Sequence, residues 1–139
     1  MRASGSALVC TTVALLVIGP AAGAKSKDQT PPTFAGLKSA TTCVPGPIGG
    51  TTAPYHLSWD PAADNKTSSR RIVYDIFQAS ASGGEDFSAP TYTTSAGATS
   101  FTTPPLPADK VVYFVVRARD KAGNEDANKV ERQGENLCV

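Results

Sequence analysis

Hydrophobic and polar residues alternate in short runs after residue 32, and none of these runs keeps a helical period. Alternation places successive side chains on opposite faces of a strand, whereas an amphipathic helix repeats its apolar residues every three or four positions. Clusters of Gly, Pro, Asn and Asp separate the runs and are typical of turns. The pattern predicts seven short strands, at residues 34–40, 52–59, 71–79, 90–94, 100–103, 110–119 and 128–133.

The run at 110–119 indicates which side chains face the interior. One parity contains only apolar residues, and the other includes Arg117 and Arg119. Burying an unpaired arginine is costly, so the apolar parity is expected to face the core. Applied to every run, this reasoning predicts a core made of Tyr55, Leu57, Trp59, Ile72, Tyr74, Ile76, Phe101, Leu106, Val112, Phe114, Val116 and Ala118.

Residues 1–24 have the organisation of a secretory signal peptide. Arg2 gives a positive start, an apolar run follows, and Ala22-Gly23-Ala24 fits a cleavage site before Lys25. The alternative of an uncleaved anchor conflicts with the length of the apolar run, because spanning a bilayer takes about 20 residues. We therefore expect a secreted, extracellular protein, with residues 25–31 as a flexible leader and one domain over residues 32–139.

A lipoprotein is a further alternative for the same segment. It would use Cys10 as the lipidated residue, yet Cys10 lies inside the apolar run rather than after it, and bulky Val9 precedes it. This position favours cleavage by the ordinary secretory route.

Processing changes the charge and the cysteine count. The full chain has 13 basic and 12 acidic residues, a net charge of +1, and three cysteines. Loss of Arg2 and Cys10 leaves a formally neutral chain with Cys43 and Cys138. A neutral chain has no field to attract nucleic acid or an acidic membrane surface, so neither is expected as a partner.

Two cysteines in an oxidising compartment predict one disulfide, between Cys43 and Cys138. Closing so long a loop contributes about 4–5 kcal/mol in the chain-entropy description. Free or intermolecular thiols are the alternative. A closed zinc site is excluded, since it takes four ligands and His56 is the single histidine.

Several short motifs follow one another in order along the chain. They are Pro32 with Leu37, Leu57-Ser58-Trp59-Asp60-Pro61, Tyr74-Asp75-Ile76, Thr99-Ser100-Phe101-Thr102 leading to Leu106-Pro107, and residues 113–120 followed by Ala122-Gly123-Asn124. In this order they resemble the fibronectin type III family over residues 32–134. The resemblance implies an all-β fold, a seven-stranded antiparallel immunoglobulin-like β-sandwich of fibronectin type III type. An immunoglobulin domain would instead carry cysteines on its second and sixth strands.

Catalysis is not expected from these residues. A Ser-His-Asp arrangement would have to use His56 with Ser58 and Asp60, all close together in one predicted strand and its end. A strand residue on an open sheet face lacks the pocket and the oxyanion donors that such chemistry needs. We predict no enzyme activity and no cofactor, with a small hydrolase relying on His56 as the alternative.

Two features could carry binding. The first is the outward parity of the third and sixth strands, which the fibronectin type III resemblance makes neighbours. An apolar centre with tyrosine and arginine is typical of interfaces. The alternatives are a cross-strand pair that only stiffens the sheet and a patch covered by the chain's own tail. The candidate binding face consists of Val73, Phe77, Tyr113, Val115 and Arg117, with Val111 beside it.

The second feature is acidic and lies in the loops after the second and sixth strands, which the resemblance places at one end of the domain. Their oxygens could hold Ca²⁺. The alternative is that Asp and Asn make the turns there while lysines offset their charge. The candidate ligands are Asp60, Asp64, Asp120, Asn124 and Asp126.

Together these observations predict a secreted, non-catalytic domain that binds an extracellular protein or polysaccharide, as an adhesion or scaffold module does. The alternative is a secreted inhibitor or effector that blocks a partner protein through its loops.

Overall fold

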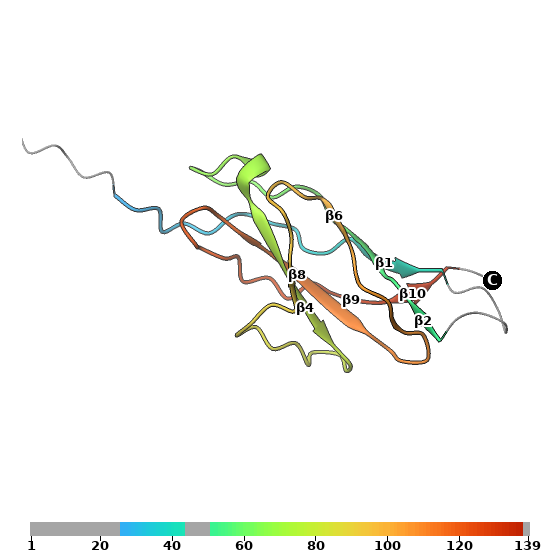
Figure 1. Ribbon diagram of the computed structural model, residues 1–139. Coiled ribbons are helices and arrows are strands. Elements are labelled where there is room, and N and C mark those ends of the chain that lie inside the picture. The colour runs from blue at the N-terminus through green and yellow to red at the C-terminus, as the bar shows by residue number, and fades with distance from the viewer. Residues whose placement is uncertain (1–25, 44–50, 138–139) are drawn as a thin grey trace, which may run out of the picture.

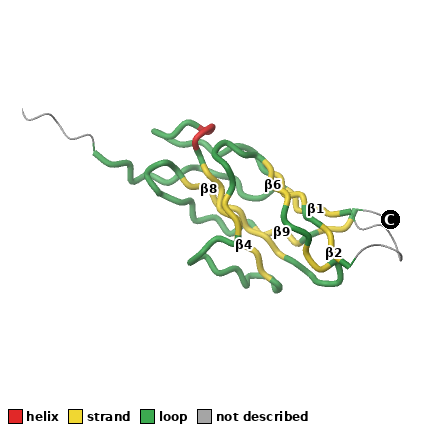
Figure 2. The backbone as a smooth tube through the Cα atoms, in the orientation of Figure 1, coloured by secondary structure: helices red, strands yellow, loops and turns green. Residues whose placement is uncertain are grey.

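The computed structural model describes residues 26–43 and 51–137. The predicted signal peptide and Cys138 therefore lie outside the described residues. Over the described ranges the chain forms strands, with one short 3-10 turn, η1 (Ser69–Arg71). No helix in this part of the chain is long and apolar enough to cross a membrane. The prediction of an all-β fold is confirmed for these residues (Figure 2).

The first sheet has the strand order β10-β1-β3-β6. Its strands are β1 (Ser39–Thr42), β3 (His56–Ser58), β6 (Ser100–Thr102) and β10 (Glu135–Asn136). β3 pairs antiparallel with both β1 and β6, whereas β10 runs parallel to β1. Sheet edges at β6 and β10 are short, which limits the backbone available for pairing with other chains.

The second sheet has the strand order β5-β4-β8-β9. Its strands are β4 (Val73–Ala79), β5 (Tyr92–Thr93), β8 (Tyr113–Arg119) and β9 (Glu131–Gln133), and all of its pairs are antiparallel. The β4–β8 pair is the longest, with seven residues in register from Val73 opposite Arg119 to Ala79 opposite Tyr113. A separate small pair joins β2 (Thr52–Ala53) to β7 (Leu106–Pro107).

The two sheets pack against each other around one hydrophobic core (Figure 1). Aromatic contacts cross between them, with Trp59 after β3 lying 5.2 Å from Tyr74 of β4 and Tyr55 lying 5.5 Å from Phe114 of β8, centroid to centroid. The predicted core parity is confirmed. Ten of the predicted residues are buried, and Phe101 and Leu106 pack against them while partly exposed.

Strand boundaries differ from the predicted runs where the backbone cannot continue extended. The first run was expected at 34–40, but Gly36 has a φ of +88° and β1 begins only at Ser39. The second run divides into β2 and β3 because Pro54 supplies no N–H for a ladder. Strands β7 and β10 were not predicted, since each has only two residues and shows no alternation.

Candidate functional site

The predicted binding face on β4 and β8 is covered by the chain's own loop. Phe77 and Val115 are each only 1% exposed, so the prediction that they lie open on the surface is wrong for the centre of this face. Phe87, from the connection between β4 and β5, packs edge-on against Phe77 with 5.1 Å between ring centroids. Val73 and Tyr113 lie at the two ends of the paired strands and are half-buried.

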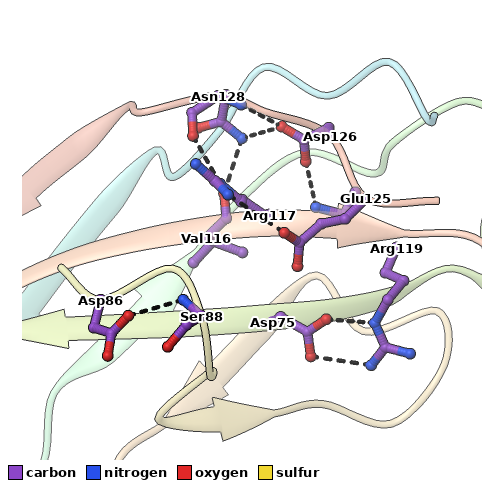
Figure 3. Close-up of polar contacts among 10 residues, drawn as sticks. Asp75, Asp86, Ser88, Val116, Arg117, Arg119, Glu125, Asp126 and Asn128 are labelled. Atoms are coloured by element: carbon purple, nitrogen blue, oxygen red, sulfur yellow. Dashed lines mark hydrogen bonds and ion pairs between the residues drawn. The ribbon is translucent and has the colours of Figure 1, made fainter. Parts of the chain in front are cut away.

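Arg117 points away from the core, as its parity predicted, but it does not face solvent freely. Its guanidinium carbon lies 3.7 Å from the Phe87 centroid, a cation–π contact. Its Nε donates to the carbonyl of Asn128 at 3.0 Å, and one terminal nitrogen lies 3.4 Å from Glu125 Oε2 (Figure 3). Arg117 therefore holds the β4–β5 loop and the 124–130 segment against β8 and is not available to a partner.

Asp75 and Arg119 form a second polar contact on this side of the sheet. Arg119 donates from Nε to Asp75 Oδ2 at 2.5 Å and from a terminal nitrogen to Oδ1 at 3.1 Å (Figure 3). The hydroxyl of Thr93 also donates to Asp75 Oδ1, at 2.6 Å. Burial alone would raise the pKa of Asp75, but these donors and the positive charge outweigh burial and hold it below its ordinary value. The pair is structural, since each acceptor oxygen of Asp75 already has a donor.

The acidic candidates divide into two groups. Asp64 and Asp120 lie close together at one end of the molecule, and Asp28 joins them. Each of the three offers one carboxylate oxygen, and these oxygens all lie within 4.8 Å of one another. The remaining candidates have other roles, so only part of the predicted ligand set assembles. Asp60 pairs with Lys38 at 3.4 Å on the exposed surface.

Asn124 and Asp126 shape the neighbouring loop. Asn124 donates its backbone N–H and its amide to Asp120 at 2.8 and 2.7 Å, and its amide also reaches the carbonyl of Asp28 at 3.2 Å. Asp126 accepts hydrogen bonds from the backbone N–H groups of Ala118 and Asn128 (Figure 3). Both therefore orient the loop after β8 by making turns, which is the alternative that the sequence left open.

Asp28 is the member of the cluster that sequence reasoning missed. It lies in residues 25–31, expected to be a flexible leader, yet its side chain is only 7% exposed and Thr30 donates to its Oδ1 at 3.1 Å. A lone aspartate in a polar stretch gives no periodic signal. The one available sign was an isolated acid placed shortly before the Pro31-Pro32 pair that fixes the chain's direction into the domain.

The residues of the hydrolase alternative do not form a catalytic arrangement. His56 Nδ1 lies 3.1 Å from Thr102 Oγ1, Ser58 Oγ lies 2.7 Å from Ser39 Oγ, and Asp60 pairs with Lys38. His56, Ser58 and Asp60 thus each have a different partner. A nucleophile and its base need to share a hydrogen bond, and here they do not.

The outer face of the first sheet is polar and is a surface that the sequence analysis did not single out. The register aligns Ser39, Ser58 and Ser100 in one row, and Thr41, His56 and Thr102 in the next. All six side chains are exposed or half-exposed. Alternation in three adjacent strands could have revealed this face, because the same parity that buries Leu57 turns hydroxyl groups outward.

No known protein family, curated protein sequence or solved structure matches the chain.

Proposed function

We propose that the chain is a secreted, non-catalytic domain of fibronectin type III type that binds an extracellular protein or polysaccharide. The observation that carries the proposal is the strand order of the two packed sheets, β10-β1-β3-β6 and β5-β4-β8-β9. Seven of these strands pair antiparallel, and the short β10 adds an eighth that runs parallel to β1. Division of about seven antiparallel strands between two packed sheets is typical of immunoglobulin-like sandwiches. The pairing of β4 with β8 agrees with the neighbouring third and sixth strands that the resemblance implies.

The polar face of β1, β3 and β6 is the surface that supports binding best. Phe87 and Arg117 lie over Phe77 on the other sheet, whereas the two rows around His56 are exposed or half-exposed. Hydroxyl and imidazole groups can donate and accept hydrogen bonds, which suits recognition of polar extracellular polymers. Glu135 of β10 lies opposite Thr41 in the His56 row and adds one exposed negative charge to this face.

Binding assays with surface variants test this proposal. The purified protein is incubated with insoluble cellulose, chitin and immobilised extracellular matrix proteins, and the retained fraction is measured. We expect retention by one of these classes and a strong loss with His56→Glu, which places a charge among the hydroxyl rows. Retention by none of them, or hydrolysis of a bound polymer that His56→Ala abolishes, would contradict the proposal.

The alternative of an inhibitor acting through a loop has one observation in its favour. Residues 80–84 of the β4–β5 connection are exposed. Two contacts hold this connection in place. Phe87 packs against the Arg117 guanidinium, and Glu131 accepts hydrogen bonds from Ser82 Oγ at 2.7 Å and Gly83 N at 2.6 Å. Pre-organised loops bind with less loss of conformational entropy. Ala81→Lys would then abolish capture of a partner protein while His56→Glu leaves it unchanged.

A further inference from the structure

We propose that Asp28, Asp64 and Asp120 form a binding site for a divalent cation with oxygen ligands, of the size of Ca²⁺. Three carboxylate oxygens from three separate segments lie within 4.8 Å of one another. The segments are the N-terminal leader, the loop after β3 and the loop after β8. The site is separate from the polar face proposed for binding, so the two proposals stand or fall independently.

Two oxygens of this cluster are buried without a hydrogen-bond donor in the part of the chain that the structure describes. They are Asp28 Oδ2 and Asp64 Oδ1. The Asp28 side chain is only 7% exposed to solvent. An unpaired carboxylate oxygen at such a position costs free energy unless a cation or another group satisfies it. A cation bound between the carboxylates would satisfy both oxygens at once.

The other oxygens of Asp28 and Asp64 are held by backbone donors, and both oxygens of Asp120 accept hydrogen bonds from Asn124. Thr30 N donates to Asp28 Oδ1 at 3.1 Å, Lys66 N and Thr67 N donate to Asp64 Oδ2 at 2.8 and 2.6 Å, and Asn124 N donates to Asp120 Oδ1 at 2.8 Å. These bonds fix the direction of each carboxylate. They also leave one oxygen of Asp28 and one of Asp64 unused, so the arrangement is pre-organised for a ligand.

The charge of the cluster favours a divalent ion. Lys66 is a cationic residue beside the cluster. Its Nζ lies 3.9 Å from Asp28 Oδ1, the oxygen that already has a donor, and its side chain is 52% exposed. Three carboxylates beside one partly exposed lysine leave an excess of negative charge that a divalent cation would neutralise.

The ligand chemistry indicates which ion. Carboxylates without histidine or cysteine suit hard cations rather than zinc or copper. Ca²⁺ binds oxygens at about 2.3–2.6 Å and accepts irregular geometry, whereas Mg²⁺ requires a smaller and nearly regular octahedron at about 2.0–2.1 Å. Oxygens separated by up to 4.8 Å fit around an ion of the larger size. Binding would fasten the N-terminal leader to the loops after β3 and β8.

Thermal unfolding and titration calorimetry on the purified protein test this site. With free Ca²⁺ at about 2 mM, above the about 0.1–1 mM dissociation constants of extracellular modules, we expect one ion per chain and a melting temperature about 5 °C higher than in EDTA. Mg²⁺ at the same concentration should give a smaller shift. No calcium-dependent shift with no heat of binding, or a shift with Mg²⁺ alone, would overturn the proposal.

The variant Asp28→Asn distinguishes a metal-binding role of Asp28 from a purely structural role. The amide can donate to a neighbouring carboxylate and removes one negative charge, so the variant should be at least as stable as the wild type in EDTA while losing the calcium response. Asp60→Asn is the matched control, because Asp60 lies in the same loop as Asp64 but pairs with Lys38 outside the cluster. It should keep the full response. Equal destabilisation by Asp28→Asn with and without calcium would assign the cluster a structural role only and refute the metal site.

Discussion

Tyr74 combines packing with hydrogen bonding at one residue. Its ring is fully buried and contacts Phe34 and Trp59, each with 5.2 Å between centroids. Its hydroxyl accepts a hydrogen bond from the backbone N–H of Ala62 at 2.8 Å. Alternation in the sequence predicted the buried ring, but it could not predict the partner of the hydroxyl, because that contact depends on the path of the loop after β3.

Replacing this hydroxyl tests its contribution. Tyr74→Phe leaves the buried N–H of Ala62 without its acceptor, and we expect a loss of about 1–2 kcal/mol in the free energy of unfolding. Tyr92→Phe is the control, since the Tyr92 hydroxyl makes a longer contact of 3.3 Å with Gln78 at a partly exposed position. Its effect should be clearly smaller when both are measured by urea unfolding. Equal losses would show that the hydrogen bond from Ala62 N to the Tyr74 hydroxyl contributes no more stability than the Tyr92–Gln78 contact.

Asp75 makes stability depend on acid. Its folded pKa lies below the ordinary value because Arg119 and Thr93 outweigh the effect of burial. A depressed pKa means that the unfolded chain binds the proton more tightly. The stabilisation is therefore present above about pH 4, the ordinary range of an aspartate, and it is lost as the pH falls through the folded value.

Arg119→Met should expose this dependence. Asp75 would stay buried with Thr93 as its remaining side-chain donor, and we expect a loss of about 2 kcal/mol, below the range for fully buried pairs because Arg119 is partly exposed. Acid unfolding would then begin at a higher pH. Lys38→Met, which removes an exposed pair, should change stability by less than about 0.5 kcal/mol. Similar losses of stability in the two variants would refute the claim that the Asp75–Arg119 pair stabilises the fold more than an exposed ion pair does.

Among the elements, the β4–β5 connection decides which surfaces of the molecule are open. Residue parity correctly assigned Phe77 and Val115 to the second face of their sheet, but the cover comes from Phe87, which has no periodic relation to either strand. A signal was present, because β4 and β8 carry apolar residues in both parities, which is typical of strands buried on both sides. Which segment supplies the cover follows only from the three-dimensional path.

Two carboxyl groups join this connection to β9. Glu131 accepts hydrogen bonds from Ser82 and Gly83, and Glu85 lies beside it. Burial raises the pKa of Glu85, and the negative charge of Glu131 raises it further. A raised folded pKa means that the native state binds the proton more tightly, so stability falls as the pH rises through that value.

Glu85→Gln should remove this penalty. The neutral amide can donate to Glu131, so we expect a higher melting temperature at pH 7.5 and a flatter pH dependence in the window above about pH 4.3, the ordinary glutamate pKa. Asp86→Asn should instead lower stability slightly, because Ser88 donors hold the pKa of Asp86 below its ordinary value. An unchanged slope in Glu85→Gln would refute the carboxyl pair as the source of the dependence.

The entry to β1 depends on Gly36. Its φ of +88° is one that residues with a side chain rarely adopt, and an added Cβ would lie 2.5 Å from Val130 Cβ. Gly36→Ala therefore combines backbone strain with a clash, and we expect a loss of about 3 kcal/mol. Gly83→Ala is a matched control with a φ of +71° and open space around it, so it should lose only about 1 kcal/mol. Equal losses in urea unfolding would contradict close packing of the 124–130 segment.

For the whole molecule, local pattern and long-range path contributed different parts of the fold. The alternation of β3, β4 and β8 predicted which of their side chains form the core, because the preference for burial acts on each residue separately. The acidic cluster of Asp28, Asp64 and Asp120 could be predicted only in part, because Asp28 and Asp120 are far apart in the sequence and meet only in the folded chain. Strand β10 had no sequence signal, because it is two polar residues whose place depends on pairing with β1.

That pairing bears on the predicted disulfide. Thr42 lies opposite Asn136, and Leu137 N donates to the carbonyl of Thr42 at 3.0 Å. Cys43 and Cys138 are the next residues after Thr42 and Leu137, so the described backbone brings the neighbours of both cysteines side by side. Cys138 itself lies outside the described residues, and the bond remains a prediction.

Non-reducing peptide mapping should find Cys43 linked to Cys138, and reduction should lower the free energy of unfolding by about 4 kcal/mol, because the bridge restricts the unfolded chain over nearly the whole domain. The double variant Cys43→Ser and Cys138→Ser should show the same loss and should no longer respond to reductant. The calcium-dependent stabilisation should persist in it, because the acidic cluster draws on the leader and on the loops after β3 and β8 rather than on the β1–β10 pair. Two reactive thiols in the untreated protein would contradict the disulfide.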